Sequence, residues 1–98
     1  MRSILVTPRS LTAHGDPELE RLRSAGFRLV MGPAGRQPTE GELLELVVGC
    51  VGWLAGVEKI SAKVLRSASE LRVISRNGTG IDNIDLEADR KTFADIFS

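Results

Sequence analysis

Cysteine, aromatic residues and long apolar runs are scarce in this 98-residue sequence, which holds one Cys, one Trp, three Phe and no Tyr. The lone Cys50 excludes an internal disulfide and a cysteine-based metal cluster. The start Met1-Arg2-Ser3 has no signal-peptide pattern. Together these features predict a protein of the reducing cytoplasm.

Neither the charge nor the apolar runs predict nucleic acid or a membrane as a partner. Lys and Arg number 13, and Asp and Glu also number 13, so no broad field would attract nucleic acid or anionic lipid. Gly49, Gly52 and Gly56 interrupt the longest apolar run, which falls short of the roughly 20 residues of a membrane span. We therefore expect a soluble protein of a single domain with a modest core.

Short apolar runs alternate with helical segments along the chain. The runs predict strands buried on both faces, at residues 3–7, 27–31, 50–55 and 71–75. Strands separated by helices of this length are joined by right-handed crossovers. The sequence thus predicts an α/β fold, a doubly wound parallel sheet of about four strands.

The helices carry their own start signals. Asp16-Pro17 opens one that Gly26 ends, Thr39 and Glu42 have capping-box spacing, and Ser61 caps a third. Their expected inward residues are Leu19, Leu22, Ala25, Leu43, Leu44, Val47, Val48, Val64, Leu65 and Ala68. A last helix is expected from Asp85. Since no strand follows it in this sequence, we expect an unpaired sheet edge and self-association.

The stretch "RNGTGIDN" after the fourth run is the main candidate site. As a G-x-G-x-x-G nucleotide fingerprint it fails, because Asn83 replaces the third glycine, the turn follows the fourth strand, and the ribose-binding acid expected about 20 residues on would lie beyond Ser98. Ligands of open α/β sheets bind at the carboxyl ends of the strands. A small carboxylate could meet the loops there, which include Ala55-Gly56 and Arg76-Asn77-Gly78-Thr79-Gly80. The alternative is that these glycines only form sharp turns.

The segment "LRVISRNGTGIDNIDLEA" resembles the D-isomer-specific 2-hydroxyacid dehydrogenases, the group of phosphoglycerate dehydrogenase and glyoxylate/hydroxypyruvate reductase. "AGVEKISAKVLRSASEL" and "ILVTPRSLT" are similar to the loop, helix and opening strand that precede it in that family. The resemblance implies a flavodoxin-like substrate-binding domain. It also implies that the backbone at Thr79 and Gly80 holds the carboxylate of a 2-hydroxy or 2-oxo acid, that Gly78 shapes the turn, and that Arg76 assists in phosphoglycerate-type members.

Several family features are missing from these 98 residues. The resemblance places the catalytic arginine, glutamate and histidine and the NAD or NADP loop downstream, so we expect no cofactor site in this chain and no activity from it alone. Ala55 stands where phosphoglycerate-type members often have an arginine, which argues against a phosphate-bearing substrate. After Ala88 the pattern breaks, and we expect a truncated substrate-binding domain over residues 1–98. The alternative functions are a small-carboxylate-binding module or a homo-oligomeric interaction module.

Single residues have simpler interpretations. We expect His14 in a surface loop, Cys50 as a buried apolar group and Trp53 packed against a helix, with ligand stacking as the alternative for Trp53. Arg9 is expected in solvent. Capping or solvated charges are expected rather than general bases at three glutamates, Glu42, Glu45 and Glu58.

Overall fold

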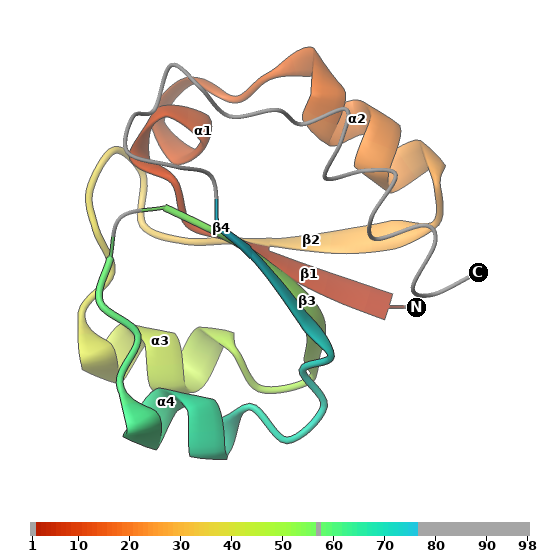
Figure 1. The fold of residues 1–98 in the computed structure, drawn as a ribbon. Helices are drawn as coiled ribbons and strands as arrows, with labels where there is room; N and C mark the ends of the chain where they lie inside the picture. Colours follow the sequence, from red (N-terminus) through yellow and green to blue (C-terminus); the bar gives the residue numbers. More distant parts are fainter. Residues whose placement is uncertain (1, 57, 77–98) are drawn as a thin grey trace.

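The computed structural model describes residues 2–56 and 58–76, and its strands and helices alternate as the sequence predicts (Figure 1). The elements are β1 (Arg2–Val6), α1 (Arg9–His14), α2 (Pro17–Ser24), β2 (Phe27–Met31), α3 (Glu40–Leu46), β3 (Cys50–Ala55), α4 (Ala62–Ser67) and β4 (Val73–Arg76). The last predicted helix, from Asp85, lies outside the described residues.

Within this part of the chain the four strands form one parallel sheet in the order β2-β1-β3-β4. The helices α1 and α2 cover one face, and α3 and α4 cover the other (Figure 1). The predicted α/β class and doubly wound layout are confirmed. The strand order is also that of the first four strands in the flavodoxin-like arrangement.

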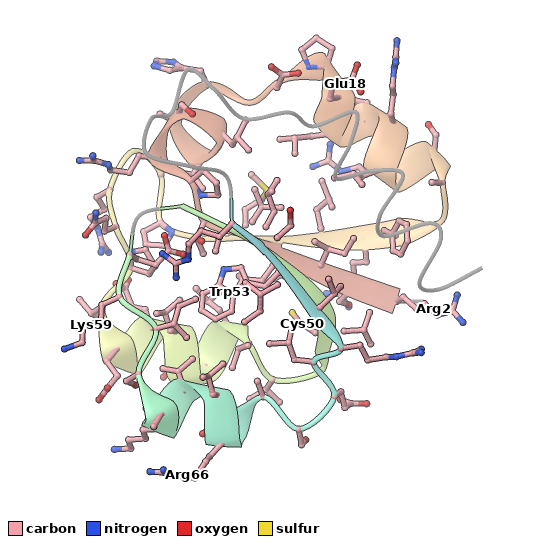
Figure 2. All side chains as sticks on the ribbon, in the orientation of Figure 1. Arg2, Glu18, Cys50, Trp53, Lys59 and Arg66 are labelled. Atoms are coloured by element: carbon pink, nitrogen blue, oxygen red, sulfur yellow. The ribbon has the colours of Figure 1, made fainter. Side chains whose placement is uncertain are left out.

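Alternate residues of β1 supply both cores, because successive side chains of a strand point to opposite faces. Ile4 and Val6 lie in the cluster under α1 and α2, whereas Leu5 lies in the cluster over α3 and α4. All three are fully buried. Trp53 belongs to the second cluster and lies between the sheet and α3 (Figure 2). Its predicted packing against a helix is confirmed.

The predicted helix starts are confirmed by their hydrogen bonds. Asp16 accepts from the Glu18 N–H at 2.9 Å. Thr39 and Glu42 form a reciprocal capping box, with bonds of 3.2 and 2.9 Å between side chain and backbone. The Ser61 hydroxyl accepts from the Val64 N–H at 3.2 Å. Each signal joins residues two or three positions apart, which is why the sequence alone could reveal it.

Four predictions of local structure are wrong. Ala25, which we expect to face inward, is exposed, because it is the cap residue after α2 and the chain turns at Gly26. Residues 9–14 form α1, which was expected as a loop and places His14 at a helix end; a helix of six residues with one buried side chain, Leu11, shows too little periodicity to detect. Val48 is 67% exposed, because α3 ends before it and the chain turns at Gly49. Leu65 is 47% exposed, since α4 buries Val64 instead.

Among residues 2–56 and 58–76, no helix combines the length and the apolar character needed to span a membrane.

Candidate functional site at the carboxyl ends of the strands

The parallel sheet brings the carboxyl ends of all its described strands to one edge. The chain goes from β1 to β2 on one side and then from β2 to β3 on the other, so the strand order reverses between β1 and β3. Ligands of open α/β sheets bind outside the strand ends at such a reversal. Thr7 follows β1 there, and Gly56 follows β3. This point is therefore the place to look for a site.

Thr7 is buried and tied to β3 by its backbone and its side chain. Its N–H donates to the Leu54 carbonyl at 3.2 Å. Its hydroxyl accepts from the indole Nε1 of Trp53 at 3.0 Å and donates to the Glu58 carboxyl group. The hydroxyl is therefore used both as a donor and as an acceptor, and the indole N–H of the buried Trp53 ring is satisfied.

Glu58 is only 3% exposed, so of the two expected roles, a capping or a solvated charge, the solvated one is wrong. One carboxyl oxygen accepts from the Gly56 N–H at 3.0 Å, and the other takes the Thr7 hydroxyl. Burial without such partners would be unfavourable for a carboxyl group. We call these four groups, Trp53, Thr7, Glu58 and the Gly56 amide, the Glu58 network. Sequence reasoning could not detect it, because Thr7 and Glu58 lie 51 residues apart in the chain.

Arg76, the last residue of β4, lies over the same loop. Its Nη1 donates to the carbonyls of Gly56 and Glu58, both at 3.1 Å. Its backbone pairs in register with Ala55. The loop after β3 thus has its amide turned toward the Glu58 side chain and its carbonyls toward the guanidinium.

The structure brings three of the predicted site residues together, namely Ala55, Gly56 and Arg76. The side chain of Ala55 is 1% exposed and packs in the core cluster of Trp53. The other four predicted residues, Asn77, Gly78, Thr79 and Gly80, lie outside the described residues, so their roles stay predictions.

The structure adds Thr7, Pro8 and Glu58, of which the sequence places only Thr7 and Pro8 in a loop at this edge and none among the predicted site residues. Pro8 is buried against Gly56, where a Cβ would lie 3.0 Å from the Pro8 Cα. A polar residue directly after a buried strand was the available signal for Thr7. For Glu58, the signal was an acid two residues after the Gly56 turn.

A hollow of about 220 Å³ lies away from this site, between the end of β2 and α3, and is lined by Gly32, Glu42 and Leu46, among others. Glu42 is engaged there by Arg36, whose guanidinium donates to both carboxyl oxygens at 2.8 and 2.7 Å. This bond, together with the Thr39 N–H, lowers the pKa of Glu42 from about 4.5 to about 2. The carboxylate therefore serves as a cap, as predicted.

Cys50 is buried, as the sequence predicts, and its thiol lies 3.3 Å from the Leu46 carbonyl. Burial raises the pKa of this thiol, which makes it a poor nucleophile. Among the residues that the structure describes, no group of three His, Cys, Asp or Glu side chains could hold a metal ion.

Comparison with known proteins identifies the family. The family model described as "D-isomer specific 2-hydroxyacid dehydrogenase, catalytic domain" matches residues 6–92. The chain belongs to this family. The resemblance inferred from residues 71–88 is thereby confirmed.

Curated relatives in this family are D-3-phosphoglycerate dehydrogenases. The pig (Sus scrofa) protein is 40% identical over 70 residues, which are 70% of this chain and 13% of that protein. The human protein is 42% identical over 48 residues, which are 48% of this chain and 9% of the human protein. The chain therefore spans a small fraction of these relatives.

Solved structures agree on the fold. The TT0316 protein from Thermus thermophilus is 35% identical, with a TM-score of 0.66 over 92% of this chain and 28% of that one. The NAD⁺-bound 3-phosphoglycerate dehydrogenase of Entamoeba histolytica is 23% identical, with a TM-score of 0.61 over 89% of this chain and 29% of that one. The second likeness supports the fold alone.

Proposed function

We propose that these 98 residues form part of the substrate-binding domain of an NAD-dependent dehydrogenase, and that they bind the carboxylate of a small 2-hydroxy or 2-oxo acid. The observation that carries the proposal is that Thr7 after β1 and Gly56 after β3 meet at the reversal of strand order, with Arg76 at the end of β4 bound to the Gly56 carbonyl, in a chain of this family. Backbone N–H groups at such a turn are suitable donors to a carboxylate. The donors we propose are those of Thr79 and Gly80.

The proposal assigns the nicotinamide cofactor to polypeptide other than the described residues. A dinucleotide-binding unit presents glycines and free N–H groups in its first strand-to-helix turn. This chain has Thr7-Pro8 there, and a proline has no N–H to offer a pyrophosphate. When bound, an oxidised nicotinamide would accept the hydride that leaves C2 of the 2-hydroxy acid. We infer that the 98 residues alone bind the acid without transferring hydride.

Titration by NMR tests the binding directly. Glyoxylate and D-lactate at millimolar concentrations should shift the amide signals of residues 76–80, whereas lactamide, which has no carboxylate, should not. Replacing Thr79 by proline removes one proposed donor N–H and should abolish the shifts, while Thr79→Ala keeps the N–H and should preserve them. Equal binding by the two variants would contradict the assigned donor. Measurable NADH-dependent reduction of glyoxylate by the 98 residues would contradict the inferred inactivity.

We also propose that the protein is cytoplasmic and self-associates. Within the described sheet, β2 and β4 each pair with a single neighbour, and unpaired strand edges favour association between chains. The buried, unreactive thiol of Cys50 suits a reducing compartment. Light scattering at several concentrations tests the association, and a monomer mass at all of them would refute it.

A further inference from the structure

The Glu58 network lies where the fold would otherwise offer donors to a ligand anion. Two groups capable of donating to an anion meet at the end of β1 and β3, the Gly56 N–H and the Thr7 hydroxyl. Both already donate to one carboxyl group, that of Glu58. The hydroxyl has only one proton to donate, and its oxygen already accepts a hydrogen bond from the Trp53 N–H. A ligand anion at this point would have to displace the side chain of Glu58.

The packing leaves little room for such a displacement. Glu58 is 3% exposed and Thr7 is 1% exposed. A Cβ at Gly56 would come within 3.0 Å of both the Pro8 Cα and a Glu58 oxygen, so the loop and the β1 end are in close contact. Groups packed this closely keep one arrangement. The Glu58 carboxyl group is therefore a fixed part of this sheet edge.

The guanidinium of Arg76, which lies nearby, is also partly bound by the protein itself. Arg76 donates through Nη1 to two backbone carbonyls of the loop that carries Glu58. An arginine that recognises a phosphate does so best with a bidentate pair of N–H groups. Here one guanidinium nitrogen is bound to the protein itself, which weakens Arg76 as a partner for a second ligand anion.

We propose that Glu58 is a specificity-determining residue, an internal anion that fills the position between the ends of β1 and β3 and excludes a second anionic group of the ligand. This inference rests on the proposed function, since that function supplies the first anionic group, the substrate carboxylate. It narrows the substrate class to 2-hydroxy acids without a phosphate or a second carboxylate directed at this loop. A like charge held close by in the protein disfavours a second anion.

The matched ligands D-glycerate and 3-phospho-D-glycerate differ only by the phosphate and are the probes for this test. Binding is measured on the full chain by NMR titration, with inorganic phosphate as a third probe. Wild type should bind 3-phosphoglycerate no more tightly than D-glycerate. A tenfold preference for 3-phosphoglycerate would overturn the proposal, and this measurement needs no variant.

Glu58→Gln keeps the shape of the side chain and removes its charge. Removing this unit charge should tighten binding of 3-phosphoglycerate by about tenfold, while D-glycerate binding stays within about twofold. The matched control is Glu45→Gln, an equal charge change at an exposed position on α3, which should leave both affinities unchanged. The indole N–H signal of Trp53 reports whether the network survives in each variant.

The outcomes separate the two proposals. An unchanged ratio of affinities in a folded Glu58→Gln protein, or an equal gain in the Glu45→Gln control, would overturn the role of Glu58. If wild type binds no D-glycerate, the proposed function fails, and the role of Glu58 is then tested by the binding of inorganic phosphate alone. A tenfold gain in phosphate binding on Glu58→Gln would then support it, and no gain would overturn it.

Discussion

Replacing Thr7 by valine tests whether its hydroxyl holds the Glu58 network together. Valine keeps the shape of threonine and removes the group that joins the Trp53 indole to the Glu58 carboxyl. Both partners are buried, with Trp53 at 0% exposure and Glu58 at 3%. The variant therefore leaves one donor and one acceptor without their bonds in the interior.

The magnitude follows from these two groups. An unsatisfied buried polar group costs about 1–3 kcal/mol, and the methyl group that replaces the hydroxyl returns about 0.8 kcal/mol of apolar burial. We expect Thr7→Val to lower the free energy of unfolding by about 3 kcal/mol. This is a large share of the roughly 5–15 kcal/mol that stabilises a typical domain.

Thr7→Ser is the matched control. It keeps the hydroxyl and removes the methyl carbon that lies beside Gly32, which should cost about 1 kcal/mol. Urea unfolding followed by circular dichroism and by the fluorescence of the single Trp53 measures both variants. Two results would refute the role given to the hydroxyl: a Thr7→Val protein whose free energy of unfolding lies within about 0.5 kcal/mol of wild type, or a Thr7→Ser protein that is less stable than Thr7→Val.

Three further predictions concern other contacts. Because the pKa of Glu42 is lowered to about 2 by Arg36 and Thr39, this carboxylate stabilises the fold above pH 4.5 and loses most of that contribution as pH falls to 2. Arg36→Met should therefore lower the urea midpoint at pH 7, less so in high salt, and only slightly at pH 2; an equal drop at both pH values would contradict the ion pair. Gly56→Ala should cost about 1–3 kcal/mol because its Cβ would meet the Pro8 Cα at 3.0 Å. Gly41→Ala on α3 would place its Cβ no closer than 4.0 Å to the Thr39 hydroxyl and should stabilise by about 0.5–1 kcal/mol; equal effects of the two variants in thermal unfolding would contradict the packing. Val47→Ala should cost about 2 kcal/mol, since Val47 is fully buried, and Val48→Ala less than about 0.5 kcal/mol, since Val48 is 67% exposed; a reversed order of the two losses would contradict the burial of Val47.

The parts of the fold that the sequence could predict depend on neighbours in the chain. Asp16, Thr39 and Ser61 each cap a helix through a residue two or three positions later. The run Cys50–Ala55 was predicted at its observed bounds, because buried parallel strands are continuous apolar segments in a sequence. These signals, taken in order, were enough for the α/β class and the parallel sheet.

The parts that failed depend on tertiary contacts. Val48 has the same apolar character as Val47, and only the end of α3 separates the buried residue from the exposed one. Glu58 has the sequence context of a solvated loop acid, because its partner Thr7 lies 51 residues away. For the site, the sequence placed Gly56 and Arg76 at one edge, but the bonds between them follow from the register of β3 and β4.

The strand order gives a physical reason for an internal acid at this edge. A backbone N–H beyond the end of the strand ladder has no carbonyl of a neighbouring strand opposite it and needs another acceptor, since an unpaired buried N–H is unfavourable. The Thr7 N–H finds the Leu54 carbonyl, but Gly56 lies one residue beyond β3 and has passed the end of that ladder. Glu58 supplies the missing acceptor from its own loop. The same carboxyl group that completes the fold therefore uses the Gly56 N–H and the Thr7 hydroxyl at the strand reversal, which supports our proposal that a substrate carboxylate is bound by the turn after β4.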